Sequence, residues 1–129
     1  MRAGELAGLT WAKYHGHYAR LDMTKSGAAR DVPLSLKARR VFDRARGFDP
    51  VLCFGVGSQS LDTLFRRARD RAGLSGFTFH DSRHTAATWI AASGRLHLLE
   101  LCKIFGWRDP KHAMIYVNPT VVDLAHKLG

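Results

Sequence analysis

The stretch FHDSRHTAAT, residues 79–88, holds the most informative pattern in this chain of 129 residues. If it is helical, His80 and Arg83 share one face a turn apart, and His84 lies one turn beyond His80. Arginine can bind two oxygens of a phosphate as a fork, and histidine can move a proton near neutral pH. We therefore expect an anion-binding face on a helix that runs from about His80 to Ser93.

The composition indicates one packed domain with a polyanionic partner. Hydrophobic residues make up 46% of the chain, and 20 Lys and Arg outnumber 11 Asp and Glu. The net charge of +9 and the pI near 10.3 make nucleic acid the first candidate, although a solvated arginine-rich face gives the same numbers. Cys53 and Cys102 stand alone in apolar settings and are expected as free thiols of a reducing cytoplasm. No stretch is apolar enough to span a membrane, and no signal peptide opens the chain.

The first third of the chain predicts a short helix followed by a small sheet. Residues 1–9 resemble the last turns of an amphipathic helix, and residues 17–24 alternate as a half-buried strand does. The residues predicted to face the core are Ala19, Leu21 and Met23. Residues 25–27 have turn chemistry, and residues 30–34 run back as the partner strand. Lys25 is therefore expected at the tip of a hairpin.

The remainder of the chain is patterned as helices. They are predicted over residues 36–45 with Ser35 as N-cap, from Ser58 or Ser60 to Gly73, from His80 to Ser93, over 96–105 up to Gly106, over 110–116 after Asp109, and over 120–128. The run 51–54 is either a strand fragment or a plug beneath a loop. Trp11 and Trp89 are predicted core aromatics. These elements together predict an α+β fold, mainly α, with a small antiparallel sheet near the N-terminus.

Four arginines lie largely off the apolar stripe of the helix that follows Ser58; they are Arg66, Arg67, Arg69 and Arg71. They either contact DNA phosphates or form a solvated helix face, and the pattern leaves both open. Lys111 and His112 precede Tyr116 closely and are further candidates for contact with DNA.

Other polar residues of the chain suit cleavage of a phosphodiester without a metal ion. That chemistry needs cations for the transition-state charge, a proton acceptor for the nucleophile and a proton donor for the leaving oxygen. The candidates are Arg2 and Arg83 as cations, Lys25 as donor, His80 as acceptor, Trp107 as an indole hydrogen-bond donor and Tyr116 as nucleophile. The sequence has neither a carboxylate cluster suited to Mg²⁺ nor a glycine-rich nucleotide loop, so we expect no cofactor.

Four segments in this order resemble the tyrosine recombinases, also called phage integrases. MRAGELAGL resembles the end of their first arginine motif, and TKSGAARDVPLS resembles the hairpin that carries their active-site lysine. HDSRHTAAT is similar to their His-x-x-Arg helix, and FGWRDPKHAMIYVNP resembles the segment that leads to their nucleophilic tyrosine. Trp107 precedes Tyr116 by nine residues, as in that pattern. Most members have His where this chain has Trp107.

The resemblance implies a role for each matching residue. Arg2 and Arg83 would bind the non-bridging oxygens of the scissile phosphate, and Lys25 would protonate the leaving 5′ oxygen. His80 would act as acid or base, Trp107 would hydrogen-bond the phosphate, and Tyr116 would form a 3′-phosphotyrosyl intermediate without ATP. The residues implied in support are Glu5, which would orient the site, and His84.

The resemblance also implies the organisation of the protein. Residues 1–129 would form a single, partial C-terminal catalytic domain, with the N-terminal DNA-binding domain and the first catalytic helices absent. The partner would be double-stranded DNA, on which the full-length protein would assemble as a tetramer, whereas this fragment is expected to be monomeric. The protein would work at the nucleoid in a bacterial or phage-infected cytoplasm, away from membranes.

Two alternatives remain open. His80 and His84 have the His-x-x-x-His spacing of zinc ligands, although Asp81 stands where zinc proteases have Glu, and Arg83 would place a cation beside the metal. The other alternative is a DNA-binding fragment of the same fold that does not turn over.

Overall fold

The structure is a computed structural model that describes residues 1–23 and 28–129. Its elements are, in order, α1 (Ala3–Ala7), the 3₁₀ turn η1 (Trp11–Lys13), β1 (Tyr18–Leu21), β2 (Arg30–Pro33), α2 (Leu36–Ala45), α3 (Ser58–Arg71), α4 (Phe79–Ala92), α5 (Leu98–Phe105), α6 (Lys111–Met114) and α7 (Val121–Leu128). Helices dominate the described residues, and β1 and β2 form a two-stranded antiparallel sheet. The predicted fold class is confirmed.

The sheet has one buried face and one exposed face. Ala19 pairs with Val32 and Leu21 pairs with Arg30, and all four residues are buried. The prediction that Met23 also faces the core is wrong, because its side chain is 71% exposed. β1 ends at Leu21, so the alternation of side chains between the two faces of the sheet does not extend to Met23.

A first core lies against the buried face of the sheet. It gathers Leu9 from the end of the N-terminal segment, Phe42 from α2 and Cys53 from the segment after α2. The backbone N–H of Cys53 donates to the carbonyl of Leu9 at 2.8 Å, and Leu52 makes an isolated β-bridge beside it. The run 51–54 is therefore both a strand fragment and a plug. Trp11 packs half-buried at the edge of this core.

A second core lies among α4, α5 and α6. Its buried apolar residues are Ala87, Leu101, Phe105 and Ala113. The placement of Trp89 in a core is wrong, because this side chain is 73% exposed. The buried face of α4 runs through Arg83 and Ala87, one helical turn apart, and Trp89 lies off that line.

Most helix boundaries agree with the sequence signals. Ser35 caps α2 as predicted, and its Oγ accepts a hydrogen bond from the N–H of Ala38 at 3.2 Å. The expected serine cap of α3 is wrong, since Gly57 is the N-cap and Ser58 is already helical. Gly106 ends α5 in the left-handed conformation, with φ 72°.

The predicted helix over 110–116 is shorter in the structure. Pro110 is the N-cap and Met114 is the last helical residue of α6. Tyr116 consequently follows the helix, and its N–H donates to the carbonyl of Ala113 at 3.0 Å. This turn carries the Tyr116 side chain back toward α4.

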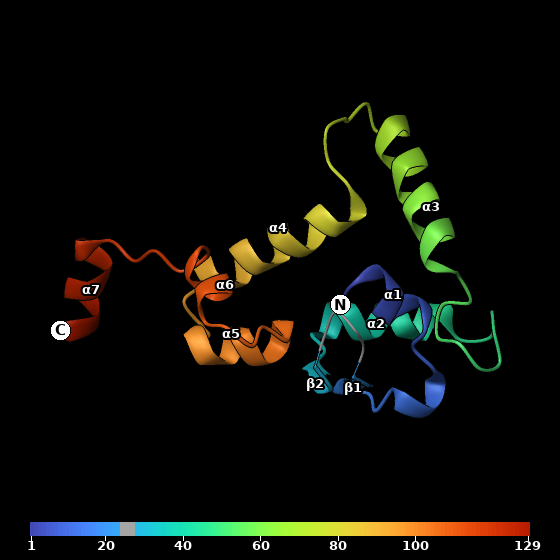
Figure 1. The fold of residues 1–129 in the computed structure, drawn as a ribbon, viewed down its shortest axis with the longest axis horizontal. Helices are drawn as coiled ribbons and strands as arrows, with labels where there is room; N and C mark the ends of the chain where they lie inside the picture. The colour runs from blue at the N-terminus through green and yellow to red at the C-terminus, as the bar shows by residue number, and fades with distance from the viewer. Residues whose placement is uncertain (24–27) are drawn as a thin grey trace.

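The elements form two groups that meet beside the chain's N-terminal segment (Figure 1). α1, α2 and the sheet surround the first core, α3 packs on α1 and leads to α4, and α5 contacts β2. α7 lies at the far end, and all of its residues are exposed, including the apolar Val121, Leu124 and Leu128. Among the described helices, none combines the length and apolarity needed to cross a bilayer.

Candidate active site

Arg83 is a buried cation at the junction of the two cores. It projects from α4, is 7% exposed, and its Nη2 donates to the carbonyl oxygen of Phe105 at the end of α5. Its Cζ lies 5.0 Å from the ring centroid of Phe105 and 5.9 Å from that of Trp107. Its Nη1 is buried and has no hydrogen-bond partner among the described residues. Arg83 therefore has a buried donor nitrogen that no described residue satisfies, which is unusual for a buried polar group.

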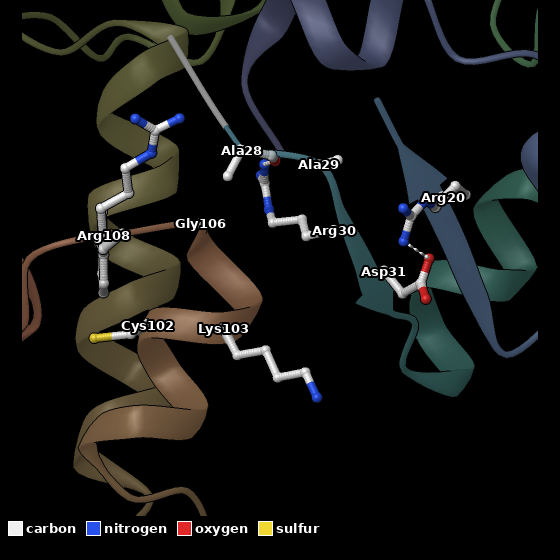
Figure 2. A pocket seen from close by; sticks show the side chains of 10 residues that line it. Arg20, Ala28, Ala29, Arg30, Asp31, Cys102, Lys103, Gly106 and Arg108 are labelled. Carbon is white, nitrogen blue, oxygen red and sulfur yellow. Dashed lines mark hydrogen bonds and ion pairs between the residues drawn. The ribbon is translucent and has the colours of Figure 1, made fainter. Parts of the chain in front are cut away.

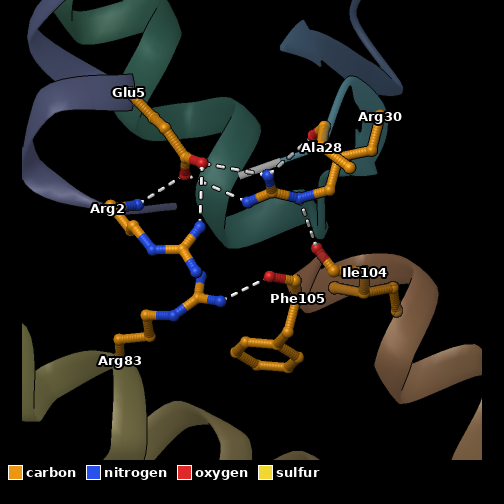
Figure 3. Close-up of polar contacts among 7 residues, drawn as sticks. All are labelled: Arg2, Glu5, Ala28, Arg30, Arg83, Ile104 and Phe105. Carbon is orange, nitrogen blue, oxygen red and sulfur yellow. Dashed lines mark hydrogen bonds and ion pairs between the residues drawn. The ribbon is translucent and has the colours of Figure 1, made fainter. Parts of the chain in front are cut away.

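Arg2 brings a second guanidinium to the same place (Figure 3). Its Nη1 lies 3.3 Å from Oε1 of Glu5, and its backbone N–H donates to Oε2 of Glu5 at 2.6 Å. Burial lowers the pKa of Arg83 to about 10, and the positive charges of Arg2 and Arg30 lower it in the same direction. Arg83 still carries its charge at neutral pH, so the site holds cations that repel one another until an anion arrives.

Glu5 and Arg30 form a buried ion pair behind Arg2. Arg30 Nη1 lies 2.9 Å from Glu5 Oε1 and Nη2 lies 3.0 Å from Oε2, which makes a two-pronged contact. Arg30 Nε donates to the carbonyl of Ile104 in α5 at 3.1 Å. The pair therefore ties the N-terminal segment, β2 and α5 together, and it orients Arg2 from behind.

Gly106 leaves the space that the Arg30 guanidinium occupies. A Cβ at Gly106 would lie 2.9 Å from Nη1 of Arg30, and the positive φ of 72° at this residue also favours glycine. The same turn brings Trp107 onto the ring of Phe105 at a centroid distance of 4.7 Å. The end of α5 is thus shaped to hold Arg30 on one side and the aromatic residues on the other.

Arg30 is a site residue that the sequence analysis missed. The signal was present, because strand alternation places Arg30 on the same face as buried Val32. An arginine at a core-facing position needs a buried acidic partner, and Glu5 is one of the chain's few carboxylates on an apolar segment.

The Glu5 ion pair predicts an acid-sensitive stability. Burial alone would raise the pKa of Glu5, but hydrogen bonds from the Arg30 side chain and the Arg2 backbone outweigh it and lower the pKa to about 2. The stabilisation is therefore complete above about pH 4.5 and is lost as the pH falls toward 2. We expect Glu5→Gln to lower the free energy of unfolding by on the order of 2–3 kcal/mol at pH 7.

Urea unfolding between pH 7 and pH 2 measures this effect. The deficit of Glu5→Gln relative to the wild type should shrink below pH 4.5, whereas Asp43→Asn, at an exposed position of α2, should show little deficit at any pH. A Glu5→Gln deficit that stays constant down to pH 2 would contradict a charged Glu5 in the folded protein.

Tyr116 belongs to a row of stacked rings. The ring of Trp107 lies 5.4 Å from that of Tyr116 at 8° between planes, and the ring of His84 lies 6.2 Å from Tyr116 at 23°. Phe105 continues the row behind Trp107. Since Arg83 lies over the rings of Phe105 and Trp107, the row brings Tyr116 to the edge of the arginine site.

The hydroxyl of Tyr116 forms a hydrogen bond with Nδ1 of His84. Burial raises the pKa of Tyr116, although the charge of Arg83 lowers it. His80 is exposed, and its ring lies edge-on to that of His84 with centroids 5.1 Å apart. The structure thus gathers Arg2, Glu5, Arg83, Trp107, Tyr116 and His84 in one site, with His80 at its outer edge. Lys25, the predicted hairpin-tip lysine, lies outside the described residues.

The predicted DNA-contacting residues fall into two groups. Arg69 is held within the protein, because its Nη1 donates to the carbonyl of Phe77 at 2.8 Å, and Arg66 lies 3.5 Å from Asp62. The exposed members are Arg66, Arg67 and Arg71 on α3 and Lys111 and His112 on α6. The exposed members remain available to a polyanion.

A second basic surface was not predicted from the sequence. A hollow of about 360 Å³ lies between β2 and the end of α5, beside Trp107 and Gly106 (Figure 2). Arg20, Lys103 and Arg108 line it together with Asp31. Arg20 lies 3.1 Å from Asp31, whereas Lys103 and Arg108 have no acidic partner within residues 1–23 and 28–129. We call this hollow the groove, and we call Arg20, Lys103 and Arg108 the groove cations.

A zinc site finds no support in the part of the chain that the structure describes. No three His, Cys, Asp or Glu side chains there lie close enough together to hold a metal ion. His84, one of the two candidate ligands, directs its Nδ1 at Tyr116 instead.

The sequence of this chain is similar to those of known proteins. A Haemophilus influenzae protein described as an integrase or recombinase is 33% identical over 133 residues, which cover 99% of this chain and 43% of the relative. A shufflon-specific DNA recombinase of Escherichia coli is 31% identical over 131 residues, which cover 99% of this chain and 34% of that protein. The chain thus spans less than half the length of these two relatives.

Structural comparison agrees on the fold. The crystal structure of XerA recombinase has a TM-score of 0.77 at 18% identity, covering 98% of this chain and 51% of that one. A lambda integrase dimer bound to a core site has a TM-score of 0.74 at 19% identity, covering 91% of this chain and 47% of that one. The sequence profile of the phage integrase family matches residues 1–121. This match extends over nearly the whole sequence, and the chain therefore belongs to the phage integrase family.

Proposed function

We propose that this chain is the catalytic part of a site-specific DNA recombinase or integrase, which cleaves and rejoins DNA strands through a phosphotyrosyl intermediate. The observation that supports it best is the buried Arg83, whose Nη1 lacks a partner among the described residues and which lies beside Arg2. The ring stack holds the hydroxyl of Tyr116 at the edge of this cationic site. Cations around an attacking hydroxyl are what a phosphodiester needs in order to react.

The first step transfers a DNA strand to the protein. Arg2 and Arg83 bind the non-bridging oxygens of the scissile phosphate, and the indole N–H of Trp107 donates to the same group. Tyr116 gives up its hydroxyl proton to a base as its oxygen attacks phosphorus, and the bond from phosphorus to the 5′ oxygen breaks. Lys25 donates a proton to that leaving oxygen, in the role that the family resemblance assigns to it.

The second step returns the strand. A 5′ hydroxyl from another strand attacks the phosphorus of the phosphotyrosyl bond and loses its proton, and Tyr116 leaves and regains a proton. One phosphodiester is exchanged for another of similar energy, so the cycle needs no ATP, and the charge is neutralised by arginine rather than by a metal ion. Glu5 and Arg30 take no part in bond changes; they hold Arg2 in place.

The partner in this proposal is double-stranded DNA. The groove cations adjoin Trp107, so they can bind phosphates that flank the scissile one, and the exposed Arg67 and Arg71 extend the basic surface. The full-length protein would assemble as a tetramer on DNA at the nucleoid, as the family resemblance implies.

A change in the groove should alter the salt dependence of DNA binding. We expect Arg108→Gln to reduce the slope of log K against log salt by about 1, because one phosphate contact and its released counterion are lost. Arg69→Gln is the matched variant, and its effect should be smaller because Arg69 already binds the carbonyl of Phe77. If both variants reduced the slope equally, Arg108 in the groove would contribute no more to DNA binding than Arg69 does.

The proposed function is tested by trapping the covalent intermediate. A nicked duplex whose cleaved fragment diffuses away should leave the protein attached to DNA, and the adduct should survive denaturing electrophoresis. The substrate should be taken from the DNA that flanks the gene. DNA binding without any adduct would favour the alternative of a non-catalytic DNA-binding module.

A further inference from the structure

The side chain that contacts the hydroxyl of Tyr116 is His84. Its Nδ1 hydrogen-bonds the phenol oxygen, and the two rings lie nearly parallel at a centroid distance of 6.2 Å. The resemblance gave His84 only a supporting place and gave the acid–base role to His80. His80 touches the ring of His84 edge-on at 5.1 Å and is itself exposed.

The geometry of α4 explains why His84 reaches Tyr116. Successive residues of a helix are rotated by about 100°, so His84 points to the neighbouring side of α4 from Arg83. Arg83 turns toward the end of α5, and His84 turns toward the segment after α6 that carries Tyr116. Two adjacent residues of α4 therefore have different places in the site: Arg83 lies in the cationic centre, and His84 contacts the proposed nucleophile.

We infer that His84 accepts the proton of Tyr116 when the phenol attacks DNA, an inference that rests on the proposed function. The O–H bond of Tyr116 breaks and its proton passes to Nδ1, while the new bond forms between the phenol oxygen and phosphorus. The bond from phosphorus to the 5′ oxygen breaks, and that oxygen takes a proton from the general acid or from water. In the rejoining step His84 returns its proton to the departing phenol oxygen.

The surroundings of His84 suit a proton acceptor. Burial raises the pKa of Tyr116, so the phenol is not ionised by itself at neutral pH and needs a base. The charged and titratable groups near the pair in the described residues include His80, Asp81 and Arg83 on α4. A cavity that Tyr116 lines is also lined by His97, Asp123 and Lys127. His80 is exposed beside His84 and offers the proton a path to solvent.

Two substitutions separate proton transfer from simple positioning. His84→Asn places an amide oxygen near the position of Nδ1, so it can still accept a hydrogen bond from Tyr116, but an amide cannot take a proton. His84→Ala removes both functions. If His84 only positions the phenol, the asparagine variant should cleave nearly as fast as the wild type, and only the alanine variant should be slow.

The measurement is the single-turnover rate of adduct formation on the nicked duplex. We expect both variants to be about 100-fold slower than the wild type at pH 7, with DNA affinity unchanged. His126→Gln, at an exposed position on α7, serves as the matched histidine control and should react at the wild-type rate. Thermal unfolding should be similar for all of these proteins because His84 is exposed.

The pH dependence and the leaving group provide readouts that a structural role would not move. As the pH rises from 7 to 9.5, hydroxide replaces the missing base, so the deficit of His84→Asn should shrink by up to about tenfold per pH unit. A substrate with sulfur in place of the 5′ oxygen has a leaving group that needs no proton, because thiols ionise near pH 8.5. The deficit should persist on that substrate, since the proton of Tyr116 must still be removed.

The outcomes distinguish this inference from the proposed function. No adduct with the wild-type protein would refute the proposed function itself. A wild-type adduct that forms equally fast with His84→Asn would overturn the inference and leave the function intact. Full rescue of His84→Asn by the sulfur substrate would also overturn it, because His84 would then serve the leaving oxygen.

Discussion

Phenylalanine in place of Tyr116 is expected to abolish covalent attachment to DNA, a loss of about 10⁴-fold or more. The substitution removes only the hydroxyl, which is the proposed nucleophile, and its hydrogen bond with His84. The ring stays stacked on Trp107, so the fold and the DNA-binding surface should persist. Electrophoresis after denaturation, with binding measured on the same duplex, separates the lost reaction from intact affinity.

Tyr18→Phe is the matched control for this substitution. Tyr18 is 39% exposed on the outer face of β1, and its ring stacks on His15 rather than on Trp107. It should form the adduct at the wild-type rate. An adduct that persists in Tyr116→Phe and disappears in another tyrosine variant would place the nucleophile elsewhere and remove the basis of the proposed mechanism.

Local chemistry made most of the fold predictable from sequence. Ser35 caps α2 because its hydroxyl can accept the N–H of Ala38, and that signal needs no knowledge of the rest of the chain. Gly106 ends α5 because only glycine adopts a positive φ there without strain. The same local reasoning is wrong for Met23 and Trp89, since burial depends on which elements happen to lie above each face.

Most residues of the site were predictable from the sequence, but the contacts between them were not. Motif spacing indicated Arg2, Arg83 and Tyr116, and the structure brings these three together. Whether His80 or His84 meets the hydroxyl of Tyr116 depends on where α6 ends, and the sequence predicted that helix to run too far. Arg30 could be found only by asking what a core-facing arginine pairs with, which is a question about tertiary structure.

Arg83 should be irreplaceable, even by lysine. Its guanidinium has two different ends, because Nη2 donates to the carbonyl of Phe105 while Nη1 has no partner among the described residues. A lysine has one nitrogen on a flexible stem and cannot keep both contacts in a fixed plane. We expect Arg83→Lys and Arg83→Ala to slow adduct formation by about 100- to 1000-fold, which corresponds to roughly 3–4 kcal/mol of lost transition-state stabilisation.

The charge of the substrate can show whether this loss is electrostatic. In a methylphosphonate a methyl group replaces one non-bridging oxygen, so the reacting phosphorus carries no negative charge. If Arg83 works by neutralising that charge, the deficit of Arg83→Ala should shrink strongly on the neutral substrate. The deficit of Tyr116→Phe should remain complete on both substrates, because a missing nucleophile does not depend on charge.

The opposite result has an equally definite meaning. Arg83 is buried between the two cores, so its loss also removes a contact with α5 and leaves space beside Phe105. If Arg83→Ala were slow on both substrates to the same degree and melted at a lower temperature, the residue would hold α4 against α5 rather than bind phosphate. The unpartnered Nη1 argues against this, because a purely structural arginine would be expected to have its donors satisfied by the protein, as those of Arg30 are.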